Sequence, residues 1–364
     1  GLCAASGAEV QCNLKPSFSS RFVKFTASAD TVTHLFYFAK DKTTIALGAS
    51  GKLYVFGTDK RPMYEFTILP SIALPEINAA MSWRQYLLIG TDFGAFAIDL
   101  ETRRTQKIDL GRNVRVTNFS PGHFGTWVAF DSGVGLVTET SFTRWPDTPL
   151  SSPIEVLSVA RNGAWLYVGT YNGIYGFNKS RRVTRKLWPV DGTAVDSRIT
   201  SLHVHNNRLF AGTFSGLVTE FSFDKPGLIE EVRAHSLPSG IPAMLSHQGY
   251  LFVGTEKHGL WYFDNSSFRS MDMPDGWGLE KTPVTSIIGA PLNEHILYTT
   301  EKELGLVCFT ATPSVRATQS LPKKLSSSVL LSTAIDSEER IFIGTLNSGL
   351  LQSSMPDRSE EHTS

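Results

Sequence analysis

Residues Leu166–Phe177 read Leu-Tyr-Val-Gly-Thr-Tyr-Asn-Gly-Ile-Tyr-Gly-Phe, and this stretch decides the fold. An apolar run ends in Gly-Thr, two turn residues and a glycine follow, and a second apolar run begins. The pattern predicts a β-hairpin whose turn, Thr170–Gly173, is of type I with a left-handed glycine.

The same pattern recurs along the whole chain. Clear copies lie at 87–98, 209–221, 251–263 and 341–351, and looser ones at 45–56, 127–137 and 296–309. The residue at the first-glycine position recurs every 39 to 45 residues, roughly the length of one four-stranded propeller blade. These positions are Gly48, Gly90, Phe130, Gly169, Gly212, Gly254, Thr299 and Gly344. The spacing predicts an all-β protein, a single β-propeller of eight repeats.

Each unit divides into four strands, A to D from the inside of the ring outward. In the fifth unit we expect strand A at 199–205, B at 208–213, C at 216–223 and D at 228–234. Strand B is almost wholly apolar, as expected of a strand packed on both faces. The glycine at its end indicates a place where a neighbouring blade crowds a side chain.

The ends of the chain bear on how the ring closes. Residues 21–26 precede the first inner strand, and we expect them to complete the last blade as its fourth strand. The alternative is a ring of seven blades with the eighth unit outside it. The predicted organisation is an N-terminal segment at 1–20, the propeller at 21–355 and a non-native or disordered tail at 356–364.

Composition narrows the class of protein. Lys plus Arg equal Asp plus Glu at 34 each, so no net charge draws in nucleic acid. No apolar run reaches the length of a membrane span. The three cysteines are too few for a disulfide framework, although Cys3 and Cys12 would pair in an oxidising compartment. Cys308 is expected inside a strand as a small buried residue.

Two terminal stretches have a character of their own. Residues 1–8 could be the remnant of a secretory signal peptide. Residues 358–364 resemble a translated sequencing adapter and carry no structural expectation.

The repeats resemble those of two-component regulator propellers, the ligand-binding sensor domains of signalling proteins. The resemblance rests on Val-Thr-His-Leu-Phe at 32–36 before the first hairpin, on Leu-Tyr-Val-Gly-Thr, Leu-Phe-Val-Gly-Thr and Ile-Phe-Ile-Gly-Thr, and on the segment 273–287. The tryptophan usual in such hairpins is missing, and Phe130-Asp131 and Thr299-Thr300 replace Gly-Thr. The resemblance implies a periplasmic or extracellular sensor, a possible homodimer, that precedes a membrane span and an output domain such as a kinase.

Signatures of catalysis are scarce. The sequence contains no phosphate-binding glycine loop, serine nucleophile elbow or zinc-protease helix. His203 and His205 share one face of an inner strand, but a metal site needs further ligands. We therefore expect no cofactor, no metal and no enzymatic activity. A propeller lyase or glycosidase using His203, His205 and Arg198 is a second alternative.

Binding residues are expected on the face that carries the B–C turns and D–A linkers. Aromatic rings beside polar groups there suit a sugar or a peptide. The predicted ligand-binding residues are Trp277, Trp188, Asp191, Tyr171, Asn172, Phe214, Lys257, His258, Glu280 and Lys281.

Basic residues cluster after two of the C strands and suggest a second surface. An interaction scaffold without a small ligand would use this surface to bind an anionic protein partner. Its predicted residues are Arg103, Arg104, Arg181, Arg182 and Arg185.

Overall fold

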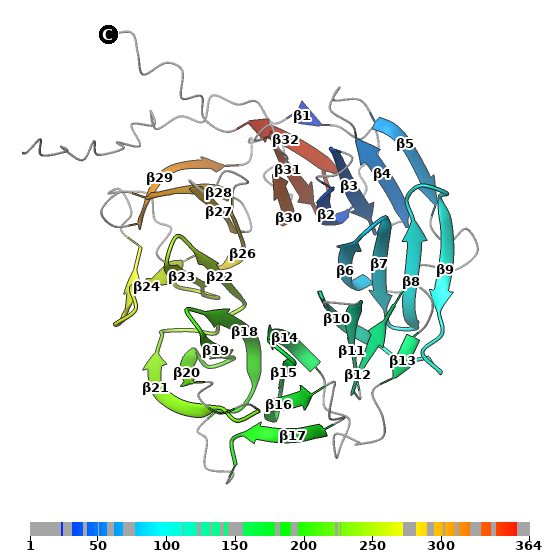
Figure 1. The fold of residues 1–364 in the computed structure, drawn as a ribbon. Coiled ribbons are helices and arrows are strands. Elements are labelled where there is room, and N and C mark those ends of the chain that lie inside the picture. The colour runs from blue at the N-terminus through cyan, green and yellow to red at the C-terminus, as the bar shows by residue number, and fades with distance from the viewer. Residues whose placement is uncertain are drawn as a thin grey trace, which may run out of the picture.

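A computed structural model shows the fold of the chain (Figure 1). The residues it describes are 23–24, 31–38, 42–49, 51–56, 62–67, 77–111, 113–121, 125–131, 133–138, 142–144, 156–178, 183–190, 196–222, 225, 227–271, 282–289, 295–300, 303–309, 313–320, 329–335 and 340–354. The predicted N-terminal segment at 1–20 and tail at 356–364 lie outside them, as do Cys3 and Cys12.

The described residues form eight four-stranded antiparallel sheets and no helix, so the predicted all-β class is confirmed. We call the sheets blades and number them from β2. Blades 1 to 4 comprise β2 (Val32–Phe38), β3 (Thr43–Gly48), β4 (Lys52–Phe56) and β5 (Pro62–Thr67); β6 (Ile77–Trp83), β7 (Tyr86–Thr91), β8 (Gly94–Asp99) and β9 (Arg104–Ile108); β10 (Val116–Pro121), β11 (Thr126–Phe130), β12 (Gly133–Val137) and β13 (Phe142–Arg144); and β14 (Val156–Asn162), β15 (Trp165–Thr170), β16 (Gly173–Asn178) and β17 (Val183–Trp188).

The remaining sheets follow the same order. Blades 5 to 7 comprise β18 (Ile199–His205), β19 (Arg208–Thr213), β20 (Leu217–Ser222) and β21 (Glu230–Ser236); β22 (Ala243–His247), β23 (Tyr250–Gly254), β24 (Leu260–Phe263) and β25 (Phe268–Ser270); and β26 (Val284–Gly289), β27 (His295–Thr300), β28 (Glu303–Phe309) and β29 (Pro313–Ser320). The last sheet holds β30 (Leu330–Ile335), β31 (Arg340–Thr345), β32 (Leu350–Ser354) and, beside β32, β1 (Val23–Lys24). Figure 1 shows the sheets around a central opening, with the first strand of each blade innermost.

The first and last blades are in contact. Val23 of β1 pairs with Gln352 of β32 in antiparallel register. Val32 and Tyr54 of blade 1 share a buried cluster with Phe342 and Leu350 of blade 8. The two ends of the repeat array therefore lie side by side.

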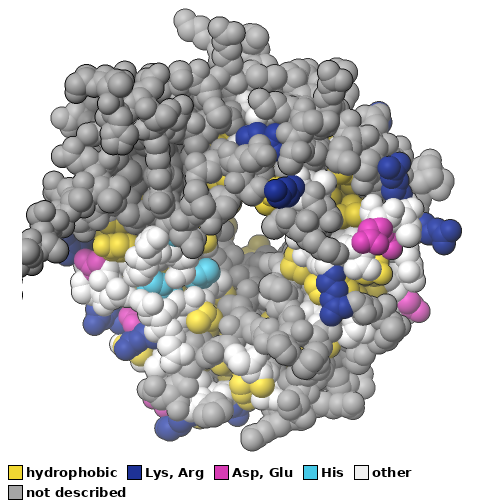
Figure 2. All heavy atoms as spheres, turned by 45° about the horizontal axis from the view of Figure 1, so that its top comes forward, with side chains coloured by type: hydrophobic (Ala, Val, Ile, Leu, Met, Phe, Trp, Pro, Cys, Tyr) yellow, Lys and Arg dark blue, Asp and Glu magenta, His cyan; other side chains and the backbone are white. Residues whose placement is uncertain are grey.

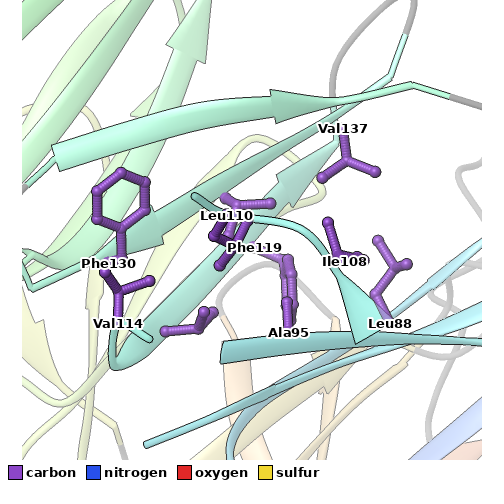
Figure 3. Packing of buried hydrophobic residues seen from close by; sticks show 10 residues of the cluster. Leu88, Ala95, Ile108, Leu110, Val114, Phe119, Phe130 and Val137 are labelled. Atoms are coloured by element: carbon purple, nitrogen blue, oxygen red, sulfur yellow. The ribbon is translucent and has the colours of Figure 1, made fainter. Parts of the chain in front are cut away.

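The core lies between adjacent blades. In one cluster, Leu88 and Ile108 of blade 2 pack with Phe119, Phe130 and Val137 of blade 3 (Figure 3). The sequence places Phe130 at the first-glycine position, but the register differs by one residue. Phe130 pairs with Val116 as Thr170 pairs with Val156, so Phe130 occupies the threonine position and Ala129 the glycine position. Phe130 is 1% exposed. Face-to-face packing of this kind explains why the B and C strands are apolar on both sides.

The recurrent glycine is required by the next blade. A Cβ atom on Gly169 would lie 2.5 Å from Cγ2 of Ile199, the first residue of the following inner strand. The corresponding distance is 2.7 Å from Gly212 to Cβ of Ile241, in the linker that enters blade 6. Neither glycine has a left-handed φ, so the constraint is one of space. The predicted crowding at the end of strand B is confirmed.

The threonine after this glycine closes the hairpin turn. The buried Thr170 hydroxyl donates to the Gly173 carbonyl at 3.0 Å and accepts the Asn172 N–H at 3.0 Å. Thr91 makes the same pair of hydrogen bonds in blade 2. Gly173 has a φ of 100°, which agrees with the predicted left-handed glycine.

We predict that Gly169→Ala lowers the free energy of unfolding by about 1–3 kcal/mol, because the new methyl group overpacks the contact with Ile199. Urea denaturation monitored by tryptophan fluorescence measures this change. The control is Gly289→Ala, on an exposed residue whose new Cβ would meet only the His247 ring, at 3.1 Å. Equal destabilisation by both variants would contradict the prediction.

Candidate binding face

The B–C turns and D–A linkers meet at one face of the ring, which we call the turn face. Its described B–C turns are 91–94, 170–173, 213–217, 255–259 and 345–349, and its described linker residues include 109–111, 113–115, 189–190, 196–198 and 237–242. Backbone hydrogen bonds join turns to linkers: the Glu256 N–H donates to the Gly240 carbonyl and the Leu237 N–H to the Gly216 carbonyl. The linkers therefore hold the turns in place.

Large hydrophobic side chains are exposed mainly on the turn face. Among the described residues, the exposed ones are Phe93, Tyr171, Val190, Phe214 and Leu346 on this face, and Leu228 and Val232 near the outer edge of blade 5. Tyr171, Phe214 and Leu346 occupy the same position, directly after the buried threonine, in three different blades. Because the threonine already closes the turn, this position is available for contacts with other molecules.

Arg198 and Phe214 form the best-defined part of the face. The Arg198 guanidinium lies over the Phe214 ring, 4.8 Å from its centroid. Asp196 Oδ1 accepts the Arg198 Nε–H at 3.0 Å and the Arg198 backbone N–H at 3.1 Å, and its Oδ2 accepts the Ser215 N–H at 3.0 Å. The carboxylate thus ties the linker to the B–C turn and orients the arginine.

Asp196 is buried, and burial disfavours its charged form. The hydrogen bonds from Arg198 and Ser215 outweigh this effect and lower the pKa of Asp196 to about 2. Asp196 is not among the residues predicted from the sequence. Asp-x-Arg directly before an inner strand was the signal available.

Tyr171 and Asn172 form the neighbouring turn in blade 4. Tyr171 is exposed, and Asn172 Oδ1 accepts a hydrogen bond from Lys186 Nζ at 3.2 Å. A Cβ on Gly173 would lie 2.8 Å from Cδ of Pro189, so this turn packs against the linker that presents Val190. The turns of blades 4 and 5 therefore flank one linker.

Trp188 belongs to the packing between blades 4 and 5. Its ring is half-buried and meets Phe221 edge to face at 5.6 Å. Its indole N–H donates to Glu231 Oε2 at 3.1 Å. These contacts account for the conformation of Trp188 without a ligand.

Lys257 and His258 lie on the turn of blade 6, with exposed side chains. Ser239 Oγ accepts the Lys257 N–H at 3.2 Å and forms a hydrogen bond with His258 Nδ1 at 3.1 Å. The linker thus anchors this turn as well. The other predicted binding residues, Trp277, Asp191, Glu280 and Lys281, lie outside the described residues.

The residues of the predicted basic surface have different environments in the structure. Arg103 and Arg104 are exposed at the β8–β9 hairpin. Arg185 instead lies over the Trp165 ring, 5.3 Å from its centroid, and donates to the Gly227 carbonyl of the next blade. Arg181 and Arg182 lie outside the described residues.

His203 and His205 join blade 5 to blade 6. His203 Nε2 accepts the Ser246 N–H at 3.1 Å, and His205 Nδ1 forms a 2.6 Å hydrogen bond with Ser246 Oγ. Burial lowers the pKa of both imidazoles, which favours their neutral forms. Figure 2 shows histidine side chains beside the central opening and acidic ones nearer the rim.

Further ligands for these histidines are missing from the described residues, which contain no group of three His, Cys, Asp or Glu side chains placed to hold a metal ion. Arg198 lies at the opposite end of β18, about 20 Å away at the rise of an extended strand. The described part of the chain also contains no helix long and apolar enough to cross a membrane.

We predict that Asp196→Asn lowers the free energy of unfolding at pH 7 by about 2 kcal/mol. The lowered pKa of Asp196 means that its contribution is present above the ordinary value of 3.8 and is lost as the pH falls through about 2. Urea denaturation at pH 7, 4 and 2.5 should show the gap between the two proteins closing. Asp109→Asn is the control, because Asp109 is an exposed linker carboxylate that accepts the Gly111 N–H. A gap that does not depend on pH would contradict the prediction.

No protein-family model matches this sequence, and a comparison with curated proteins likewise finds no match. Solved structures share its fold at low identity. Sqt1 from Chaetomium thermophilum, bound to the N-terminus of the ribosomal protein L10, matches 91% of this chain and 98% of its own with a TM-score of 0.67 and 14% identity. BamB from Moraxella catarrhalis matches 92% of this chain and 100% of its own with a TM-score of 0.64 and 12% identity.

A third similar structure is the extracellular domain of a putative hybrid two component system from B. thetaiotaomicron. It matches 92% of this chain and 40% of its own, with a TM-score of 0.56 and 16% identity. At these identities the comparisons support the propeller-type fold.

Proposed function

We propose that this chain is a ligand-binding propeller of eight blades that recognises a small ligand or a peptide segment of a partner on its turn face. The observation that carries the proposal is the exposure of Tyr171, Phe214 and Leu346 at one position of a repeated turn. Exposed rings at equivalent places on adjacent blades make a surface suited to binding. The predicted residues Trp277, Asp191, Glu280 and Lys281 lie outside the described residues and stay a prediction.

The proposed ring closes through the N-terminal strand. The pairing of β1 with β32 supports closure, and so does Gly344, whose added Cβ would lie 2.5 Å from the Val32 carbonyl oxygen. This is the glycine contact seen between consecutive blades, made between the last blade and the first.

The proposed biological setting is the periplasmic or extracellular sensor of a two-component-type protein, in which the bound ligand favours one arrangement of propeller dimers. The likeness to the extracellular domain of a hybrid two component system supports this setting. The similar structure with a bound ribosomal-protein segment supports a peptide as one kind of ligand.

An interaction scaffold without a small ligand is the second candidate. The exposed pair Arg103 and Arg104 favours it, because this pair lies at a C–D hairpin, away from the turn face. Such a scaffold would bind an anionic partner through electrostatic contacts that weaken with salt.

We predict that removing residues 1–30 lowers the midpoint of thermal unfolding, because β32 loses its neighbour and becomes an open sheet edge. Circular dichroism measures the midpoint. Removing residues 1–20 should leave it unchanged. If both truncations have the same effect, β1 does not close the ring.

We predict that Tyr171→Ser with Phe214→Ser weakens the stabilisation that a turn-face ligand gives, because it raises the Kd of that ligand roughly tenfold or more. A thermal-shift screen with oligosaccharides and peptides provides the ligand and the measurement. The matched control, Leu228→Ser with Val232→Ser, removes two exposed hydrophobic residues near the outer edge of blade 5. A ligand lost equally in both variants would place the site elsewhere.

A further inference from the structure

We infer that the turn face of blades 4 to 6 binds an extended peptide of a protein partner in which apolar residues alternate with carboxylates. This inference rests on the proposed function and names the chemistry of its ligand. It follows from the apolar groups, the exposed charges and the hydrogen-bonding state of Arg198.

The apolar groups are spread over adjacent blades. Tyr171 is 49% exposed and Phe214 48%, and Val190 on the linker between them is 81% exposed. Pro189 packs tightly against Gly173 in the blade 4 turn. Val190 is the next residue in the chain, so it lies beside this turn. Two rings on adjacent turns and an aliphatic side chain on the linker that joins their blades suit the apolar side chains of a peptide better than one flat sugar ring.

Among the described residues of this part of the face, the most exposed charges are cationic. Lys186, Arg198 and Lys257 are exposed, whereas the described carboxylates at these turns and linkers are the buried Asp196 and the half-buried Glu256. Both Asp196 oxygens already accept hydrogen bonds from Arg198 and Ser215. At the described residues a ligand therefore meets positive charge, and charge complementarity there favours an acidic partner.

Arg198 is prepared to receive a carboxylate. Its Nε donates to Asp196, and its guanidinium lies over Phe214, so its orientation is set before any ligand binds. Among the described contacts its two Nη atoms have no partner. A guanidinium held in this way binds a carboxylate oxygen through charge-assisted hydrogen bonds.

An extended peptide matches the arrangement because its side chains alternate between two sides at about 3.3 Å per residue. Apolar residues on one side would cover Tyr171, Val190 and Phe214. The intervening carboxylates would reach Arg198 and, one blade further, Lys257. A ligand that makes all of these contacts therefore spans blades 4 to 6.

The test is selection from a random peptide library displayed on phage against the immobilised full chain, followed by fluorescence-polarisation measurement of Kd for the enriched peptides. We expect enrichment of Asp and Glu alternating with Leu, Ile, Phe or Trp. Arg198→Gln should raise the Kd about tenfold, and added NaCl should raise it as well.

The matched control is Arg269→Gln. Arg269 pairs with Asp264 at 2.9 Å near the C–D hairpin of blade 6, as Arg198 pairs with Asp196 at 3.0 Å, and both arginine side chains are about half exposed. Its Kd should be unchanged. Arg198→Lys keeps the charge without the planar guanidinium, so it should fall between the wild type and Arg198→Gln, and circular dichroism checks that each variant folds.

The remaining outcomes separate the inference from the proposed function. Basic or neutral enriched peptides, no enrichment, or equal effects of Arg198→Gln and Arg269→Gln would overturn the inference. If an oligosaccharide binds instead and loses its site in Tyr171→Ser with Phe214→Ser, the proposed function stands without the inference. Acidic peptides that bind this double variant with unchanged Kd would overturn both.

Discussion

In five of the eight blades the packing depends on one steric constraint, the absence of a side chain at the glycine near the end of strand B. Leu47, Ala129 and Thr299 take that place in the other three. At the glycines, a side chain of the next blade fills this space. A Cβ atom added to Gly90, Gly169 or Gly254 would lie 2.5 to 2.8 Å from a methyl carbon of Val116, Ile199 or Val284, respectively. The hydrophobic effect brings the blades together, but this contact sets where along the strands they meet. Because a β-branched side chain fits only over the glycine, adjacent blades can pack in only one register along their strands.

This constraint is local to each pair of blades, and so is the hydrogen bonding that follows it. The threonine after the glycine satisfies the backbone of its own turn, as Thr170 does with Gly173 and Asn172. The next residue has no part in closing the turn. Tyr171, Phe214 and Leu346 stand at that position, where a small polar residue would serve the turn equally well and would expose less apolar surface. Their exposed apolar surface is therefore not needed to close the turn.

Sequence reasoning succeeded where the decisive contacts are short-range. The hairpin at Leu166–Phe177, the left-handed Gly173 and the apolar B strands follow from neighbours within a few residues. The partners of Trp188 and Arg185 are different, because Glu231 and Gly227 lie more than forty residues away. The sequence around a tryptophan before a linker, or around an arginine in an outer strand, does not tell whether the side chain faces solvent or the next blade.

The same limit explains why Asp196 and Arg198 were not recognised as one unit. Their spacing is visible in the sequence, but their meaning depends on Ser215 and Phe214, which the linker brings beside them.

The inner strand β18 shows how a propeller separates two chemistries along one element. Arg198, just before its first residue, is held by Asp196 with its guanidinium half exposed. His203 and His205, near its other end, are hydrogen-bonded to Ser246 of the next blade, and burial lowers the pKa of each. At the rise of an extended strand, Arg198 lies roughly 17 Å from His203 and roughly 23 Å from His205 along the chain. The strand is thus preceded by an exposed cation at the turn face and carries, near its other end, imidazoles that join blade 5 to blade 6.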